Sequence, residues 1–452
     1  MTLLNELSAE VCQRARMSRD PRFDGRFFVA VKTTGIFCRP ICPANLPKED
    51  NVEYFSSQAL AVSAGYRPCL RCRPESAPHS WAWKGAETTF LRALTLIEQG
   101  ELDGSLETLA SRLGISDRYL RQLFQRHLGM PPKQYAQIQQ LMFAKQLLHT
   151  SQISITEVAY ASGFQSTRRF NDAFQKLFRL TPTQVRRERA ALPSRNHLSL
   201  AFRGPFDWAH MLDFYRLRAI EGMELVDEQS YQRHFVLGEG TGWFKASMAQ
   251  SHLDIEFEME RLSDLRHLVA RLRRMFDLDA DLISIEAHLE QLAPGLVRRT
   301  GIRIPGVWNA WEAGVRAVLG QQVSVKAAIG QLNLLVSTLA ASEGSTRYFP
   351  TPEQVQMSDL SFLRMPERRK ETLKRLADYV RLHPMDSPMA WLSLSGIGPW
   401  TVDYAQLRGE SRSHCFLTGD LIVKKALAKF PQLTAESVAP WGSYATFHCW
   451  SH

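Results

Sequence analysis

Hydrophobic and polar positions follow two different periods along this chain. Residues 253–260, Leu-Asp-Ile-Glu-Phe-Glu-Met-Glu, alternate strictly between apolar and acidic side chains. A period of two residues is typical of a half-buried β-strand. The stretches before residue 190 and after residue 305 are instead helical in pattern. The pattern therefore predicts a mixed α/β segment between two helical ones.

An internal repeat lies in the first helical stretch. Residues 106–124 return as residues 155–174, with matching alanine, glycine, serine and phenylalanine positions. Each copy predicts a short helix, a glycine turn, a serine N-cap and a second helix, which together form a helix-turn-helix. A helical bundle with a solvated arginine face is the alternative, and the tandem arrangement argues against it. The arginines predicted to face the major groove of DNA are Arg118, Arg121, Arg168 and Arg169.

Composition and charge narrow the class of protein. The 452 residues are 44% hydrophobic and 22% charged, which is ordinary for globular domains. The formal net charge of +9 falls entirely within residues 1–192, since residues 193–452 hold 29 basic and 29 acidic side chains. A polyanion is the partner expected for the basic part. No apolar run is long enough to span a membrane and no signal peptide is evident, so we expect a cytoplasmic protein without a membrane partner.

Three seams divide the chain. They lie near residues 74–80, 190–197 and 294–305, where proline or glycine interrupts the pattern. The predicted fold class is multidomain α+β. We expect a small α/β module with a four-cysteine zinc site, an all-α double helix-turn-helix, an α/β subdomain and a final all-α domain, over residues 1–78, 79–192, 193–295 and 296–452.

Four of the seven cysteines form two closely spaced pairs. Three residues separate Cys38 from Cys42, two separate Cys69 from Cys72, and 26 lie between the pairs. Two such pairs predict a tetrahedral zinc site with Zn–S distances of about 2.3 Å. From spacing alone, a purely structural zinc is favoured.

The residues around these cysteines extend the interpretation. Phe-Cys-Arg-Pro at 37–40 and Gly-Tyr-Arg-Pro-Cys-Leu-Arg-Cys at 65–72 resemble the N-terminal domain of the Ada DNA-repair regulators. The resemblance implies that the four cysteines bind zinc and that Cys38 accepts a methyl group from a methylated DNA phosphate. Methylation would neutralise one thiolate and raise DNA affinity. The repeat resembles the paired helix-turn-helix of AraC-type regulators over about residues 85–190.

The C-terminal part contains a second candidate for chemistry. Leu-Ser-Gly-Ile-Gly-Pro-Trp at 394–400 predicts a helix-hairpin-helix, in which Gly396 and Gly398 let backbone N–H groups face a phosphate. About twenty residues later, Asp420 stands at a loop-to-helix junction. Taken alone, this aspartate fits an ordinary N-cap better than a catalytic group.

Together these features resemble the helix-hairpin-helix DNA glycosylases, and in detail the AlkA family, over about residues 198–452. The resemblance implies a TBP-like α/β subdomain and a catalytic role for Asp420. Relatives that also cut the backbone carry a lysine where Trp400 stands, so we expect a monofunctional enzyme. The aromatic residues that match the base pocket are Trp400, Tyr404, Trp450 and Phe214. Core packing is the alternative for each of them.

Three departures from the AlkA pattern bear on activity. Gln322 stands where the family inserts a leucine into the DNA stack, and Leu421 replaces a pocket tyrosine. Only Ser451 and His452 follow Trp450, so we expect its ring to be loosely held. A second methyltransferase domain of the Ada type, with its Pro-Cys-His-Arg run, is not present, so repair of methylated guanine oxygen is not predicted.

The sequence therefore predicts an alkylation-response protein with zinc as cofactor. It would release alkylated purines such as 3-methyladenine and 7-methylguanine, and would activate transcription after methyl transfer to Cys38. Its predicted partners are alkylated and promoter double-stranded DNA and RNA polymerase, and its predicted state is monomeric. The rival hypothesis is a DNA-binding regulator whose glycosylase-like half is weak or inactive, and Gln322 is its chief support.

Overall fold

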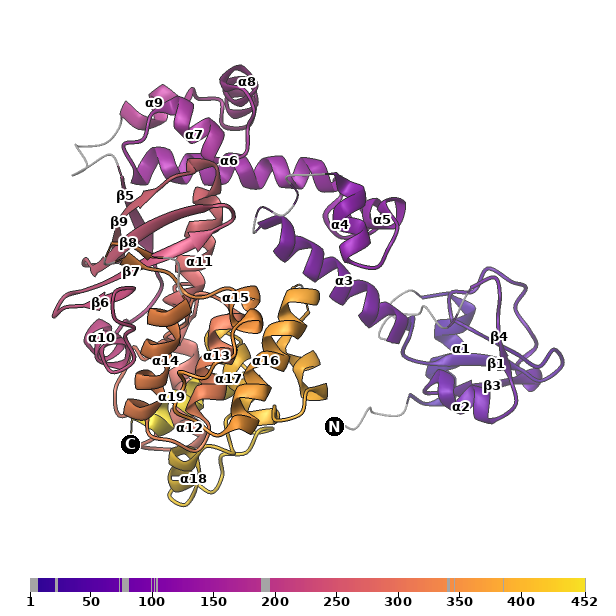
Figure 1. Ribbon diagram of the computed structural model, residues 1–452. Coiled ribbons are helices and arrows are strands. Elements are labelled where there is room, and N and C mark those ends of the chain that lie inside the picture. Colours follow the sequence, from indigo (N-terminus) through magenta and orange to yellow (C-terminus); the bar gives the residue numbers. More distant parts are fainter. Residues whose placement is uncertain are drawn as a thin grey trace. The chain divides into compact units, whose positions relative to one another are not determined.

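The computed structural model describes residues 7–451 except 21–22, 73, 75–80, 99, 101, 103–104, 188–195, 340–341, 345 and 385. The chain divides into two compact units, Met1–Gln139 and Gln140–His452, and each is treated by itself. Helices predominate, with small sheets between them, so the predicted multidomain α+β class is confirmed (Figure 1). Among the described residues, no helix is long and apolar enough to cross a membrane.

The first unit begins with the cysteine-bearing module. Its four-stranded sheet has the order β3-β1-β2-β4, in which β2 and β4 pair in parallel and the other neighbours are antiparallel. Two small apolar clusters form the module's core. Its elements are α1 (Ala9–Met17), β1 (Phe28–Val31), β2 (Ile36–Cys38), η2 (Glu49–Asn51), β3 (Val52–Phe55), α2 (Gln58–Ser63) and β4 (Arg67–Pro68).

The first repeat copy follows in the same unit. It consists of α4 (Leu106–Arg112) and α5 (Asp117–Leu128), preceded by α3 (Trp81–Glu98). The side chain of Ser116 accepts a hydrogen bond from Tyr119 N and so caps α5, as the sequence predicts. Gly114 has a φ of +67° in the turn between the helices, a value that suits glycine. A separate apolar cluster supports this copy.

The boundary between the two units falls within α6 (Pro132–Thr150). The second repeat copy then follows as α7 (Ile155–Ala161), α8 (Thr167–Phe178) and α9 (Pro182–Arg187). Ser154 and Glu157 form a capping box at α7, and Ser166 caps α8. Both copies are therefore helix-turn-helix units, with the caps that the repeat predicts.

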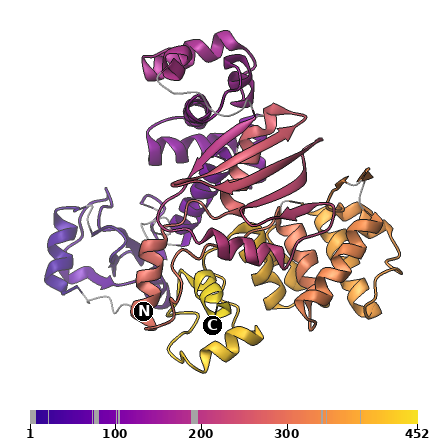
Figure 2. The same ribbon diagram turned by 90° about the vertical axis from the view of Figure 1, so that its left-hand side faces the viewer.

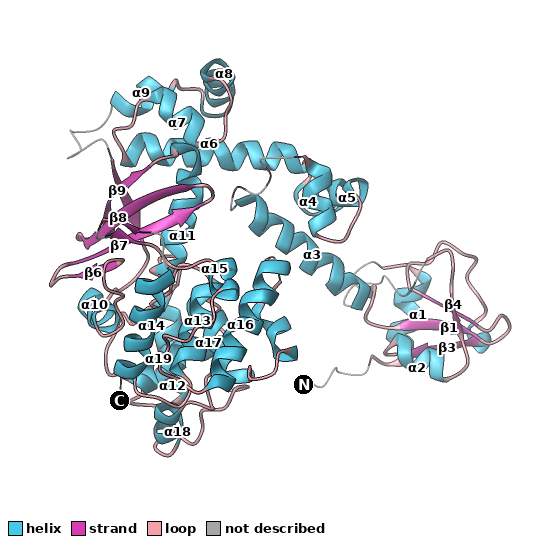
Figure 3. Cartoon of the chain, viewed as in Figure 1, coloured by secondary structure: helices cyan, strands magenta, loops and turns pink. Residues whose placement is uncertain are grey.

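A five-stranded antiparallel sheet of order β5-β9-β8-β7-β6 is drawn in magenta in Figure 3. The alternating segment forms β9, and Leu253, Ile255 and Phe257 are buried while Glu256 and Glu258 are exposed, so the predicted half-buried strand is confirmed. The elements of this part are β5 (His197–Ala201), α10 (Trp208–Arg216), β6 (Glu224–Val226), β7 (Ser230–Leu237), β8 (Gly240–Met248), β9 (His252–Met259), η4 (Leu262–Asp264), α11 (Leu265–Met275) and α12 (Leu282–Leu292).

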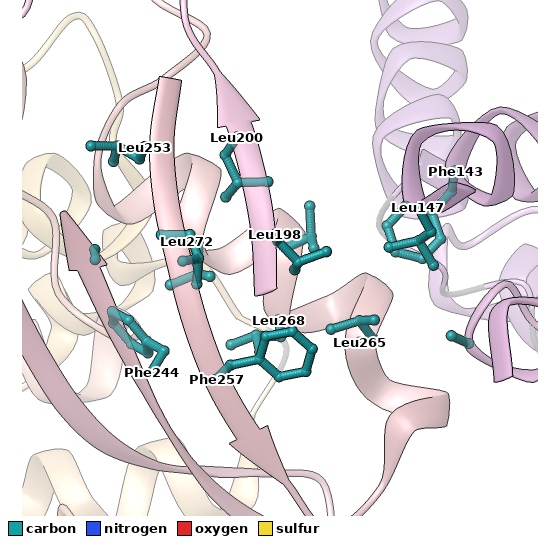
Figure 4. Packing of buried hydrophobic residues seen from close by; sticks show 14 of the residues in the cluster. Phe143, Leu147, Leu198, Leu200, Phe244, Leu253, Phe257, Leu265, Leu268 and Leu272 are labelled. Carbon is teal, nitrogen blue, oxygen red and sulfur yellow. The ribbon is translucent and has the colours of Figure 1, made fainter. Parts of the chain in front are cut away.

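The second helix-turn-helix and this sheet share one apolar core. The cluster includes Leu147 and Val158 from the helix-turn-helix together with Leu198 from β5 and Leu265 from α11. Figure 4 shows Phe143 and Leu147 of α6 facing the leucines of β5 and α11. In contrast, the first copy has a cluster of its own. The two copies therefore share a local fold but differ in what they pack against.

The remaining helices appear in orange to yellow in Figure 2. They enclose two large apolar clusters, one around α13, α14 and α16 and the other around α12, α18 and α19. Their bounds, with those of a short hairpin, are α13 (Ala310–Gly320), α14 (Val325–Leu339), β10 (Ser342–Glu343), β11 (Thr346–Arg347), α15 (Pro352–Met357), α16 (Glu367–Leu382), η5 (Pro388–Ser393), α17 (Pro399–Glu410), α18 (Leu421–Leu427) and α19 (Gly442–Trp450).

Candidate functional site

The four paired cysteines come together at one end of the first sheet. The parallel pairing of β2 with β4 places the Cys38–Cys42 pair beside the Cys69–Cys72 pair. Their sulfur atoms all lie within 4.8 Å of one another. A tetrahedron with Zn–S distances of about 2.3 Å has S–S edges of about 3.8 Å, so the donor set fits zinc.

Hydrogen bonds distinguish the sulfurs. Arg39 N donates to the Sγ of Cys72 at 3.4 Å, and the N–H of Ala44 donates to Cys42. The thiol of Cys38 shares its proton with Cys72, which raises the pKa of Cys38 and lowers that of Cys72 to about 6. A divalent cation among the four sulfurs takes the place of that proton.

The arginines near the cluster are not equivalent. The guanidinium of Arg39 donates to both carboxylate oxygens of Asp24, a buried residue, and its Nη1 donates to Cys72 O at 3.4 Å. This hydrogen bonding raises the pKa of Arg39 further. Arg67 and Arg71 are exposed. Arg39 therefore braces the cluster from within, whereas Arg67 and Arg71 are open to an outside anion.

All four predicted groove-facing arginines are exposed. Arg118 and Arg121 lie on the first turns of α5, and Arg168 and Arg169 on the first turn of α8. Arg121 pairs with Asp117 one turn earlier at 3.0 Å. An exposed ion pair of this kind is weak, so it leaves the guanidinium available to a phosphate.

A cavity of about 400 Å³ in the second unit gathers the other predicted site residues. Residues far apart in the sequence, on α10, α13, α14, α17, α18 and α19, form its walls. Trp400, Tyr404, Trp450 and Phe214 all line it, together with Asp420. The structure thus brings together the aromatic residues and the carboxylate that the sequence singles out.

Asp420 is the N-cap of α18, and it has contacts beyond that role. Its Oδ1 accepts hydrogen bonds from Ile422 N at 2.9 Å, from Val423 N at 3.2 Å and from the indole Nε1 of Trp450 at 3.1 Å. In the described part of the chain, no hydrogen bond to Oδ2 is found. The carboxylate is therefore fixed through one oxygen, and the other is left for a ligand.

The ring of Trp450 is firmly held. It stacks on Phe214 with 6.2 Å between centroids and 13° between planes, and it meets Phe447 edge-on at 4.9 Å. Its indole also donates to Asp420. The expectation of a loosely held ring is wrong, because packing within α19 and against α10 restrains it without further chain.

Phe214 differs from the other pocket aromatics. It is 9% exposed, and the guanidinium carbons of Arg218 and Arg408 lie 3.7 Å and 4.7 Å from its ring centroid. Trp400 and Tyr404 are half-buried and stack on each other at 5.3 Å. The open aromatic surface of the pocket is thus on α17, while Phe214 is engaged by the protein's own cations.

The hairpin and the loop after α13 lie beside each other. Gly396 has a φ of +93°, and a Cβ there would overlap the side chain of Thr372, so only glycine fits. The amide of Gln321 donates to Gly396 O and to Thr401 Oγ1, both at 3.2 Å. The next residue, Gln322, is exposed with a φ of +55°. Its strained backbone presents the side chain outward.

Sequence reasoning missed several polar residues of the pocket wall. His210, Asp213, Arg218 and Arg316 also line the cavity. Burial lowers the pKa of His210, and burial lowers the pKa of Arg218 to about 10. One signal was available, because Arg218 follows Phe214 by four residues and such pairs face each other on a helix.

Comparison with known proteins assigns the three parts. Residues 11–75 match the metal binding domain of Ada, residues 109–188 a helix-turn-helix domain and residues 197–309 the AlkA N-terminal domain. The chain is also 34% identical to the probable bifunctional transcriptional activator/DNA repair enzyme AlkA of Mycobacterium tuberculosis (strain ATCC 25618 / H37Rv). That match covers 98% of this chain and 96% of the relative. The chain belongs to this AlkA family of bifunctional activators and repair enzymes.

Two further relatives each match part of this AlkA-family chain. DNA-3-methyladenine glycosylase 2 of Escherichia coli (strain K12) is 33% identical over 56% of this chain and 96% of its own length. The bifunctional transcriptional activator/DNA repair enzyme Ada of Escherichia coli (strain K12) is 34% identical over 38% of this chain and 47% of its own length. The Ada-type family match and the gathered sulfurs together confirm zinc binding at Cys38, Cys42, Cys69 and Cys72.

Proposed function

We propose that this AlkA-family chain joins a zinc-held methyl acceptor, a paired helix-turn-helix activator and a monofunctional glycosylase for alkylated purines in double-stranded DNA. The observation that carries the enzymatic part is the carboxylate of Asp420, fixed through one oxygen at an aromatic cavity. The cavity of about 400 Å³ is of the size that ligand pockets have.

The base-release step uses few groups. A flipped purine lies against Trp400 and Tyr404, whose rings attract a cationic base by about 0.5–2 kcal/mol. As the C1′–N bond breaks, its electron pair goes to the base, and Asp420 stabilises the positive charge on the sugar. Water then adds to C1′ and its proton passes through Asp420 to solvent. A cationic base leaves neutral, so no strong general acid is needed.

We assign the reaction to the monofunctional class on one residue. An imine with the sugar needs a primary amine at the pocket, and Trp400 occupies the hairpin position where such a lysine would stand. Among the described residues that line the cavity, none is a lysine. The product is therefore an intact strand with an abasic site.

The methyl-transfer step takes place at Cys38. Bound zinc keeps the four sulfurs deprotonated at neutral pH. The Cys38 sulfur forms a bond to the methyl carbon of a methylated phosphate, and the C–O electron pair returns to the phosphate oxygen. Backbone N–H donors reduce the nucleophilicity of Cys42 and Cys72. The thioether has no route back, so each chain reacts once.

Methylation then acts through charge. A divalent cation with four thiolates repels the DNA backbone, and the thioether removes one unit of that negative charge. The exposed arginines of α5 and α8 supply the groove contacts at a promoter. We propose that the chain works there as a monomer in the cytoplasm and recruits RNA polymerase.

The glycosylase assignment is tested by the variant Asp420→Asn. We expect release of 3-methyladenine from alkylated duplex DNA to fall by about 10²–10³-fold, the cost of removing one preorganised charged group. Asp403→Asn is the matched control, because Asp403 lies on α17 but does not line the cavity. Unchanged release by Asp420→Asn would remove the assignment. No release by the unsubstituted chain would favour the regulator with an inactive domain.

The methyl-acceptor assignment is tested by mass spectrometry after incubation with DNA that carries methylated phosphates. We expect a gain of one methylene unit on the peptide that contains Cys38. A gain on the peptide that contains Cys69 instead would assign the acceptor to that sulfur. Binding of the promoter with equal affinity and equal salt slope before and after methylation would contradict the switch.

A further inference from the structure

Arg218 is a cation of the pocket wall with no carboxylate partner among the described residues. Its Nη1 donates to the backbone carbonyl of Phe214 at 3.2 Å. The other arginine on the wall, Arg316, is bound to Glu224 and Glu312. Arg408, behind the pocket, donates to Tyr404 Oη at 2.9 Å and to Pro305 O. Arg218 is therefore the guanidinium that retains donors for a ligand in the cavity.

A chain of contacts separates Arg218 from Asp420. The guanidinium carbon lies 3.7 Å from the Phe214 ring centroid, Phe214 stacks on Trp450, and the indole of Trp450 donates to Asp420. The cation and the carboxylate thus line one cavity with two nearly parallel rings between them. A nucleotide whose sugar lies at Asp420 directs the far edge of its base toward Arg218.

The backbone fixes this position. Arg316 Nη1 donates to Arg218 O at 2.9 Å, and Arg316 is itself held by two buried carboxylates. Burial lowers the pKa of Arg218 to about 10, while Tyr404 favours its charged form, so the side chain is still cationic at neutral pH. The pocket therefore presents a fixed positive charge to the base.

We propose that Arg218 is a specificity-determining residue of the pocket: it binds the acceptor edge of a flipped neutral purine and disfavours cationic ones. The proposal rests on the glycosylase function proposed above. A neutral purine with bare O6 and N7 atoms accepts hydrogen bonds from a planar guanidinium, as guanine does from arginine in DNA grooves. A purine that is methylated at N7 loses that acceptor and carries a like charge.

The positive charge also assists departure of a neutral base. When its C1′–N9 bond breaks, the electron pair makes the purine anionic, and Arg218 stabilises that charge without giving up a proton. Water supplies hydroxide to C1′ and a proton to the purine, so the products are a neutral base and an abasic sugar. For a cationic base the same guanidinium opposes binding. The residue therefore changes the ratio of the two reactions.

The variant Arg218→Gln tests this ratio. Single-turnover release would be measured from duplexes that carry hypoxanthine, the neutral probe, or 7-methylguanine, the cationic probe. We expect the ratio of hypoxanthine to 7-methylguanine release to fall by about tenfold or more, as for loss of one hydrogen bond to a charged donor. Arg218→Lys keeps the charge and is expected to retain the ratio within about threefold.

Arg216→Gln is the matched control, because Arg216 lies on the same helix but is exposed and pairs with Asp213 and Asp227 O. It should leave the ratio unchanged. An unchanged ratio in Arg218→Gln, or an equal loss on both probes, overturns the proposal and leaves the glycosylase assignment standing. Failure of the unsubstituted chain to release either base contradicts the glycosylase assignment itself.

A measurement on the unsubstituted chain does not depend on the folding of any variant. Free hypoxanthine and the 7,9-dimethylguanine cation would compete against release of 7-methylguanine from DNA. We expect the neutral purine to inhibit at the lower concentration, by about tenfold. Stronger inhibition by the cation would overturn the proposal.

Discussion

The zinc cluster and the base pocket are built in opposite ways. The cluster takes its four donors from two short segments, and only two small apolar clusters support the module around it. The pocket takes its walls from six helices and lies against two large apolar clusters. A module with a small core depends on its metal for stability, whereas a pocket inside a large core is already formed before a ligand enters.

Removal of zinc should have the largest effect and should separate the two sites. Structural zinc contributes roughly 10–16 kcal/mol of apparent binding free energy in small modules, so a chelator should unfold the cysteine module and abolish methyl transfer. Base release should stay within about twofold, because the pocket does not share the module's core. Circular dichroism, methyl transfer and base release would be followed on the same sample, and zinc would be added back. Loss of base release together with zinc would show that the sites are not independent.

Gly396→Ala should have the next largest effect, and it acts on the pocket side alone. Its φ of +93° and the contact with Thr372 predict a loss of about 2–4 kcal/mol in the free energy of unfolding of this half. Gly398→Ala is the matched control, because its φ is −112° and nothing lies within 4 Å of a new Cβ. It should keep the stability but weaken DNA binding, since the Cβ obstructs close approach of a phosphate. Thermal unfolding and salt titrations would distinguish the two, and equal destabilisation would contradict the hairpin assignment.

Gln322→Leu should have the smallest effect, and it should raise activity. An apolar side chain fills a vacated stack better than an amide, so we expect base release to rise about threefold to tenfold, a fraction of the cost of unstacking. Gln321→Leu is the contrast, since it removes two hydrogen bonds to the hairpin and should lower release. Single-turnover rates on one alkylated duplex would measure both. A fall in release for Gln322→Leu would mean that the amide makes a contact of its own.

The two sites were also unequally visible in the sequence. Spacing alone located the four cysteines, because the metal ligands lie in short segments that flank paired strands. Asp420 looked like an ordinary N-cap, and only the resemblance gave it a chemical role; its bond to Trp450 joins residues 30 positions apart. Arg218 and Arg316 were missed because their roles depend on carboxylates and rings that other elements deliver. The domain limits and the roles of the individual site residues stay predictions.

The common core of α6, α7, β5 and α11 has a practical consequence. A cut in the stretch between α9 and β5 falls where the sequence suggests a safe boundary, yet it would leave Leu198 and Leu265 on one fragment and Leu147 and Val158 on the other. Each fragment would expose an adhesive apolar surface that the intact chain hides. Whoever wishes to crystallise or assay the repair half by itself does better to begin upstream of α6 than at the linker.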